Sequence, residues 1–112
     1  MPKYQEQLND IFTALSDPTR RGVITHLCQG PKTVSELAQP YSMSLPSFTQ
    51  HLKVLEKSGL VSSKKEGRSR IYTIAPKHFD LADNWLEEQR LGWEQRLDRL
   101  DEYLLNLKDN MQ

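Results

Sequence analysis

The sequence predicts a mainly α-helical fold with one small β-hairpin. Two observations support this fold class. Apolar residues recur at helical spacing along most of the chain, and proline and glycine divide this pattern into segments. Residues 60–74 instead form two short runs around Glu66-Gly67, the second rich in Ile, Tyr and Thr. A chain of 112 residues has room for one modest core, so we expect a single domain over residues 1–112.

Two helices are predicted at the start of the chain. The first has an apolar stripe with the 3.6-residue period, formed by Tyr4, Leu8, Ile11, Phe12 and Leu15. It ends at Ser16. Asp17 is a suitable N-cap for the second helix, and Pro18 fits the first turn because no backbone donor is needed there. Gly30 and Pro31 end this helix shortly after Cys28.

A helix-turn-helix is predicted over residues 33–58. Thr33 and Glu36 have the spacing of a capping box, which starts a short third helix reaching about Gln39. Residues 40–43 form the turn, and Ser44 is the expected cap of a fourth helix that runs to Lys57. Its buried face is predicted to contain Leu45, Phe48, Leu52 and Leu55. Gly59 ends it in a left-handed conformation, and Leu60 folds back onto the core.

A wing hairpin over residues 60–74 and a long helix over residues 79–110 complete the prediction. The helix has apolar residues in a heptad pattern: Leu86, Trp93, Leu100 and Leu107, accompanied by Leu97, Leu104 and Met111. One small chain has little else to cover such a seam. A second copy of the chain is therefore the expected partner.

Charge is distributed unevenly, although the net charge is zero. Residues 41–75 carry six basic and two acidic residues, whereas residues 76–112 carry five basic and nine acidic ones. A basic segment of this kind suits a phosphate backbone. The helix-turn-helix and hairpin are therefore the expected contact with nucleic acid.

Two helices joined by a tight turn and followed at once by a basic hairpin are typical of a winged helix-turn-helix. We expect the fourth helix to enter the major groove of double-stranded DNA with Ser44, Pro46, Ser47, Thr49, Gln50, His51 and Lys53. Gln50 is the best candidate for base reading, because its amide can pair with adenine N6 and N7. The wing is expected to contact phosphates through Lys64, Lys65, Arg68 and Arg70.

Four segments resemble regulators of the ArsR type: LSDPTRR at 15–21, SFTQHLKVLEKSGLV at 47–61, EGRSRIY at 66–72, and WLEE with WEQRLDRL at 85–88 and 93–100. The resemblance covers nearly the whole chain. It implies a homodimer built on the first and last helices, with two recognition helices presented to adjacent major grooves and repression that an effector relieves. The expected interface residues are Leu8, Ile11, Leu86, Trp93, Leu97, Leu100 and Leu104.

The metal ligands of founding members of that family are missing. The third helix has no thiol, and the last helix has no histidine after His78. The resemblance is therefore to a metal-site-lacking branch, and we expect no cofactor. A partial ligand set of His78, Asp80 and Asp83 leaves a metal-responsive repressor as an alternative. The lone Cys28 is expected to be a half-buried small hydrophobe rather than a thiol sensor.

The sequence thus predicts a transcriptional repressor that binds an inverted-repeat operator as a homodimer. Catalytic motifs are lacking, so we do not expect an enzyme. The sequence has no apolar segment long enough to indicate a membrane partner or a leader peptide. We therefore expect a cytoplasmic protein. The competing interpretation is a winged-helix protein-interaction module that does not bind DNA. The effector, if one exists, is not identified by these residues.

Overall fold

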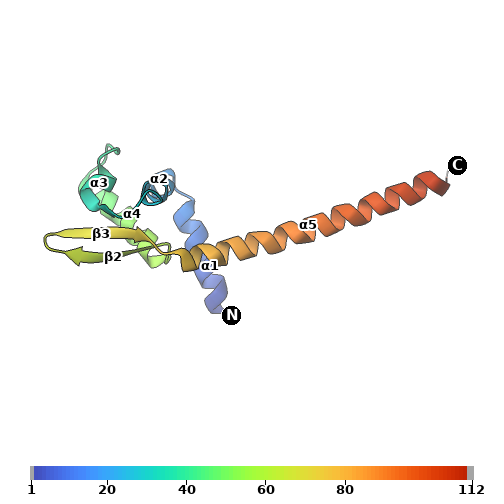
Figure 1. The fold of residues 1–112 in the computed structure, drawn as a ribbon, viewed down its shortest axis with the longest axis horizontal. Helices are drawn as coiled ribbons and strands as arrows, with labels where there is room; N and C mark the ends of the chain where they lie inside the picture. The colour runs from blue at the N-terminus through green and yellow to red at the C-terminus, as the bar shows by residue number, and fades with distance from the viewer. Residues whose placement is uncertain (1, 111–112) are drawn as a thin grey trace. The chain divides into compact units, whose positions relative to one another are not determined.

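Five helices and three strands make up the computed structural model, which describes residues 2–110 (Figure 1). In chain order they are α1 (Pro2–Leu15), α2 (Pro18–Leu27), β1 (Lys32–Thr33), α3 (Val34–Ala38), α4 (Leu45–Lys57), β2 (Val61–Glu66), β3 (Ser69–Ile74) and α5 (Pro76–Asn110). Backbone contacts divide the chain into two units. The first ends at Ala82, and the second begins at Asp83, within helix α5, whose remainder to Asn110 is the described part of this unit.

The predicted helix starts are confirmed by their caps. Asp17 accepts a hydrogen bond from the backbone N–H of Arg20 at 3.1 Å, which caps α2. Thr33 and Glu36 form both hydrogen bonds of the capping box that begins α3. Ser44 accepts from the backbone N–H of Ser47 at 3.3 Å at the start of α4. Local sequence therefore determined where these helices begin, because each cap satisfies a backbone donor that has no partner within its helix.

The wing is a three-stranded antiparallel sheet in the order β1-β3-β2. Strand β1 was not predicted, since two residues are too few to show an alternating pattern. The hairpin turn also differs from the prediction. Glu66 pairs with Ser69, so Gly67 and Arg68 form the turn, and Gly67 adopts the positive φ of 60° that such a turn requires.

The core of the first unit lies between the helices and the sheet. Its buried members are Ile11, Ala14, Val23, Leu27, Leu37, Phe48, Leu52, Leu55, Leu60, Val61, Tyr72 and Ala82. Leu45 does not belong to it, and its predicted burial is wrong, because 58% of its surface is exposed. It is the first residue of α4, where residues 42–47 are all exposed, and the helix enters the core only from Phe48 onward.

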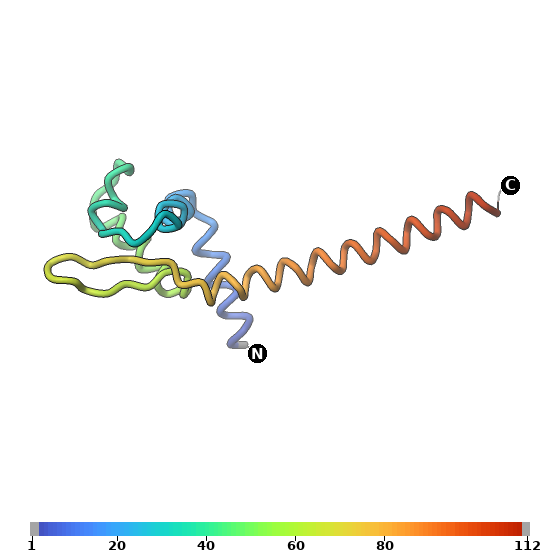
Figure 2. Tube along the Cα trace, viewed as in Figure 1, coloured from blue at the N-terminus to red at the C-terminus, as the bar shows by residue number. Residues whose placement is uncertain are grey.

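Helix α5 begins at Pro76, three residues before the predicted start at 79. In the second unit the heptad residues Leu86, Trp93, Leu97, Leu100, Leu104 and Leu107 are all exposed on this single chain. Met111 lies outside the described residues. Figure 2 traces α5 in orange and red toward the C-terminus. None of the helices within residues 2–110 has an apolar stretch of the length needed to cross a membrane.

Gly22 marks a close contact between α2 and the turn before α4. A methyl group added at Gly22 would overlap the hydroxyl of Tyr41. The ring of Tyr41 stacks on the buried Phe48, with ring centroids 5.6 Å apart. The absence of a side chain at Gly22 therefore leaves the space that the Tyr41 hydroxyl occupies.

This packing predicts that Gly22→Ala lowers the free energy of unfolding by about 1–3 kcal/mol, although alanine is the better helix former. The matched control is Gly92→Ala, because a methyl group at that helical glycine meets nothing within 4 Å. Urea unfolding at fixed protein concentration measures both. In a Tyr41→Phe background, Gly22→Ala should lower the free energy of unfolding much less. An equal decrease in both backgrounds would contradict the overlap with the Tyr41 hydroxyl.

Candidate nucleic-acid interface

Helix α4 has an exposed stripe on the face opposite its core residues. Pro46, Gln50, Lys53 and Lys57 follow one another at spacings of four, three and four, and all are exposed. The buried residues Phe48, Leu52 and Leu55 occupy the other side of the same helix. With 3.6 residues per turn, anchoring one set in the core directs the other to solvent. Gln50 and Lys53 are therefore available to an external partner.

The small polar residues at the start of α4 are partly engaged with the helix itself. The Ser44 hydroxyl donates to the hydroxyl of Ser47 at 3.0 Å. The Thr49 hydroxyl donates to the carbonyl of Leu45 at 2.8 Å. A hydroxyl has one proton to donate, so Thr49 can offer a ligand only its acceptor capacity while this bond is made. Ser47 is exposed and keeps its own hydroxyl proton available.

His51 contacts the junction between α1 and α2. Its Nδ1 lies 3.0 Å from the guanidinium Nη1 of Arg20 and 3.8 Å from Oδ2 of Asp17. Arg20 also donates to the carbonyls of Ala14 at 2.8 Å and Thr13 at 3.1 Å, both in the last turn of α1. The sequence-based prediction missed Asp17 and Arg20 as partners of His51. No local pattern joins residues separated by 31 and 34 positions.

Arg20 determines the tautomer of His51 and helps to keep Asp17 ionised. A guanidinium has only donors, so in the neutral ring of His51 Nδ1 accepts and the proton lies on Nε2. Burial of Asp17 raises its pKa, but the hydrogen bond from the Arg20 backbone, the charge of His51 when its ring is protonated, and the charge of Arg20 outweigh this effect. The pKa of Asp17 is therefore below its ordinary value.

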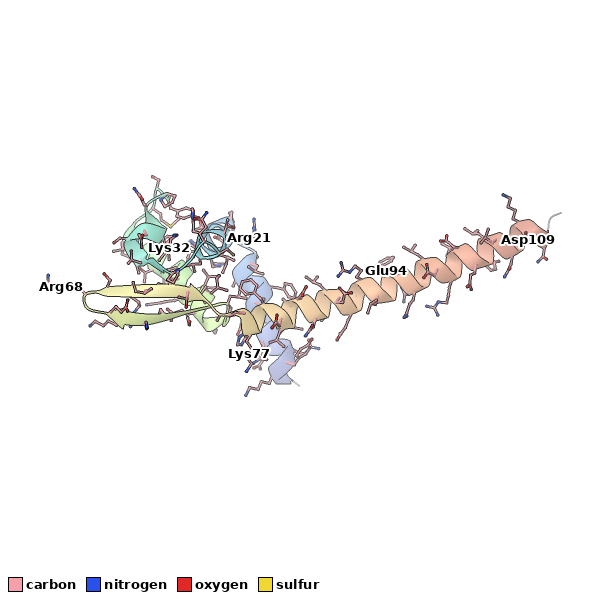
Figure 3. All side chains as sticks on the ribbon, in the orientation of Figure 1. Arg21, Lys32, Arg68, Lys77, Glu94 and Asp109 are labelled. Carbon is pink, nitrogen blue, oxygen red and sulfur yellow. The ribbon has the colours of Figure 1, made fainter. Side chains whose placement is uncertain are left out.

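The four basic wing residues are all exposed but point in different directions. Strand alternation places Lys65 and Arg70 on one face of the hairpin and Lys64 on the other. Arg68 lies in the turn, and Figure 3 labels it at the tip of the hairpin. Lys65 and Arg70 are direct cross-strand partners, an arrangement that is unfavourable without a nearby anion.

None of these four basic side chains belongs to an ion pair in the described part of the chain. Within residues 2–110 the ion pairs join Asp17 to His51 and Glu87 to Arg90. Within the described residues, no carboxylate therefore makes a direct ion pair with the basic residues of the wing. A phosphate backbone is a suitable counter-charge.

Other residues singled out by the sequence lie elsewhere. Cys28 is exposed at the end of α2, so its predicted partial burial is wrong. Ile11 has no exposed surface and Leu8 only 6%, which places both inside the chain rather than on a face open to a second copy. The ring of His78 packs against Gly59, where a methyl group would approach it to 2.6 Å. Among residues 2–110, no three His, Cys, Asp or Glu side chains are grouped to hold a metal ion.

The helices, the three-stranded wing and the exposed stripe of α4 define a winged helix-turn-helix regulator of transcription that binds DNA. The family model for bacterial regulatory proteins of the arsR family matches residues 17–63. The chain is 30% identical over 79 residues to the transcriptional repressor SdpR of Bacillus subtilis, an alignment covering 70% of this chain and 88% of SdpR. It belongs to the ArsR family, a family of transcriptional regulators and not of enzymes.

Solved structures agree with this assignment. The crystal structure of an ArsR family transcriptional regulator is 51% identical, with a TM-score of 0.78 over 84% of this chain and 97% of that one. A domain from Mycobacterium bovis, described as a homodimeric winged helix-turn-helix DNA-binding domain, is 27% identical. Its TM-score is 0.61 over 81% of this chain and 82% of that one.

The lowered pKa of Asp17 predicts how acid affects stability. Because the folded-state pKa is depressed, Asp17 stabilises the fold above its unfolded pKa of about 4, and this contribution is lost as pH falls through the folded pKa. Asp17→Asn keeps an N-capping residue but removes the charge. It should destabilise the protein at pH 7 and much less at pH 3.

Urea unfolding at both pH values measures this difference, with Asp98→Asn as the control because Asp98 is exposed on α5. The Asp98 variant should remain close to the wild type throughout. A cost of Asp17→Asn that is as large at pH 3 as at pH 7 would show that the charge of Asp17 does not stabilise this junction.

Proposed function

We propose that this ArsR-family regulator represses transcription by binding an inverted-repeat operator as a homodimer. The observation that carries the proposal is the exposed stripe of α4 beside a wing whose four basic residues make no direct ion pair within residues 2–110. In this arrangement α4 enters the major groove and the wing follows the adjacent backbone. Specificity then comes from α4, and much of the affinity from the wing charges.

Gln50 is the proposed base-reading residue. It is exposed in the second turn of α4, and the short Pro46 and Ser47 beside it allow the helix to approach the base edges closely. Lys53 reaches phosphate from the same stripe. The Nε2–H of His51 donates to a phosphate oxygen, since Nδ1 is occupied by Arg20. Ser44 and Thr49 contribute as acceptors or through water, because their protons are used within the helix.

Dimerisation is proposed to use the heptad face of α5. Leu86, Trp93, Leu97, Leu100 and Leu104 are each about half or more exposed on one chain, which is a large apolar surface to leave in water. The related domain from Mycobacterium bovis is described as homodimeric. Leu8 and Ile11 are left out of the proposed interface because both are already buried within the single chain. A dimer presents two α4 helices to half-sites about 10 bp apart.

We further infer that this regulator works without a resident metal ion. In the described chain His78 packs on Gly59, and no group of three ligand residues forms.

Repression rather than activation is supported by the description of SdpR as a repressor. A regulator of this kind blocks a promoter while its operator is occupied, and release of the DNA restores transcription.

Selection of bound sequences from a random DNA pool tests the proposed function directly. An inverted repeat should be enriched, and Gln50→Ala should then reduce the preference at one base position per half-site by about 1–3 kcal/mol. Arg68→Ala should weaken binding to all sequences alike and lower the slope of log K against log salt by about one per subunit.

The control for Gln50 is Gln95→Ala, an exposed glutamine of α5 outside the proposed contact. Equal losses on the enriched and random sequences for Gln50→Ala would remove Gln50 from base reading. If the wild-type protein is not retained on bulk DNA at low salt, the interaction-module interpretation replaces the repressor.

The dimer proposal predicts different effects for two leucines of α5. Leu100 lies in the heptad pattern and Leu105 outside it, and their exposed fractions are 50% and 62%. Leu100→Glu should give a molar mass near 13.0 kDa by light scattering, whereas Leu105→Glu should leave twice that mass. The same mass for both variants would place the interface elsewhere.

A further inference from the structure

A chain of hydrogen bonds links the recognition helix to the wing. The hydroxyl of Ser63 on β2 donates to Oε2 of Glu56 on α4 at 2.9 Å. The guanidinium Nη1 of Arg70 on β3 donates to the same hydroxyl at 2.8 Å. Ser63 therefore uses its one proton toward Glu56 and a lone pair toward Arg70, bridging a carboxylate and a guanidinium.

Strand register explains why Arg70 reaches this serine. Arg70 stands directly opposite Lys65, and Ser63 is the diagonal neighbour on the same face of the hairpin. Repulsion from Lys65 favours an Arg70 side chain directed away from its direct partner. The hydroxyl of Ser63, backed by the charge of Glu56, is the acceptor in that direction.

Tyr72 provides a second sign that the carboxylate of Glu56 is held at this place. Tyr72 pairs with Ser63 across the strands and is almost fully buried. Its burial raises the pKa of its hydroxyl and the nearby charge of Glu56 raises this pKa further, whereas Ser63 and the charge of Arg70 lower it. Glu56 is thus bonded to Ser63 of β2 and lies close enough to Tyr72 of β3 to act on its hydroxyl.

An acidic residue at this position is unexpected on a surface that binds DNA. Glu56 and Glu66 are the only acids among residues 41–75, where six basic residues lie. Considered as charges alone, both acids repel phosphate. The two differ in structure, because Glu66 is exposed beside the turn whereas Glu56 is half-buried and bonded to Ser63.

We propose that Glu56 and Ser63 are positioning residues for DNA binding, holding Arg70 and the wing in fixed register with α4. The inference rests on the proposed function and adds two residues that do not themselves touch DNA. With the bridge intact, the Arg70 guanidinium is already ordered before DNA binds. Ordering it at the moment of binding would reduce affinity.

Ser63→Ala removes the bridge without changing any charge. We expect it to weaken binding to a random-sequence DNA duplex several-fold, by about the equivalent of one hydrogen bond. Ser63→Thr keeps the hydroxyl and should restore binding. The matched control is Ser62→Ala, because Ser62 lies on the other face of β2 and its hydroxyl bonds to that of Thr73 at 3.1 Å.

Glu56 and Glu66, the two acidic residues among residues 41–75, provide an independent comparison. Glu66→Gln removes a repulsive charge and should strengthen binding to the duplex. Glu56→Ala removes the same charge but also the anchor, so its affinity should fall below that of Glu66→Gln. Combining Ser63→Ala with Arg70→Ala should cost no more than Arg70→Ala alone, since both act through one contact.

A measurement without DNA separates this inference from the proposed function. ¹⁵N relaxation of the Arg70 Nε–H should show an ordered side chain in the wild type and in Ser62→Ala, and a mobile one in Ser63→Ala. Unchanged Arg70 mobility in Ser63→Ala, or a wild-type affinity of that variant for the duplex, overturns the positioning role. If the wild type itself fails to bind DNA while Arg70 becomes mobile in Ser63→Ala, the proposed function fails and the bridge is structural only.

Discussion

The burial of one face of α4 is the constraint on which the rest of the first unit depends. Phe48, Leu52 and Leu55 have no exposed surface, and they pack within a core to which α1, α2, α3 and the sheet also contribute. Deleting such a side chain costs about 2–5 kcal/mol, a large part of the stability of a domain this size. Because a helix is rigid on this scale, fixing its apolar side also fixes the direction of Gln50 and Lys53.

Polar contacts then hold the helix at its middle and near its C-terminal end. In its second turn, His51 meets Arg20, which also binds carbonyls in the last turn of α1. In its last turn, Glu56 meets the wing through Ser63. These contacts are directional, whereas apolar packing alone tolerates small rotations and shifts. Together they give the recognition helix a defined position relative to the other helices and to the hairpin.

The distribution of charge is a further constraint on the wing. A net charge of zero conceals a basic hairpin whose cross-strand pair, Lys65 and Arg70, brings like charges together. Such an arrangement lowers the stability of the free protein by a modest amount and is relieved when an anion binds. The long helix α5 bears the compensating acidic residues. The distribution of charge, rather than its sum, therefore supports the DNA-binding surface proposed above.

The sequence by itself determined the starts of α2, α3 and α4 and the two faces of α4, because caps and helical periodicity depend on neighbours within a few residues. Asp17, Thr33 and Ser44 are such caps, and the stripe of Phe48, Leu52 and Leu55 is such a pattern. The limit of prediction from local sequence is visible at Leu45. Its spacing fits the buried stripe, although it is 58% exposed in the first turn of α4. Only the tertiary structure decided that Ile11 belongs to the core, that β1 joins the wing, and that His51 and Arg70 are held by Arg20 and Ser63. These relations join residues brought together by packing of the whole chain, and separation along the sequence carries no information about which distant side chains will meet.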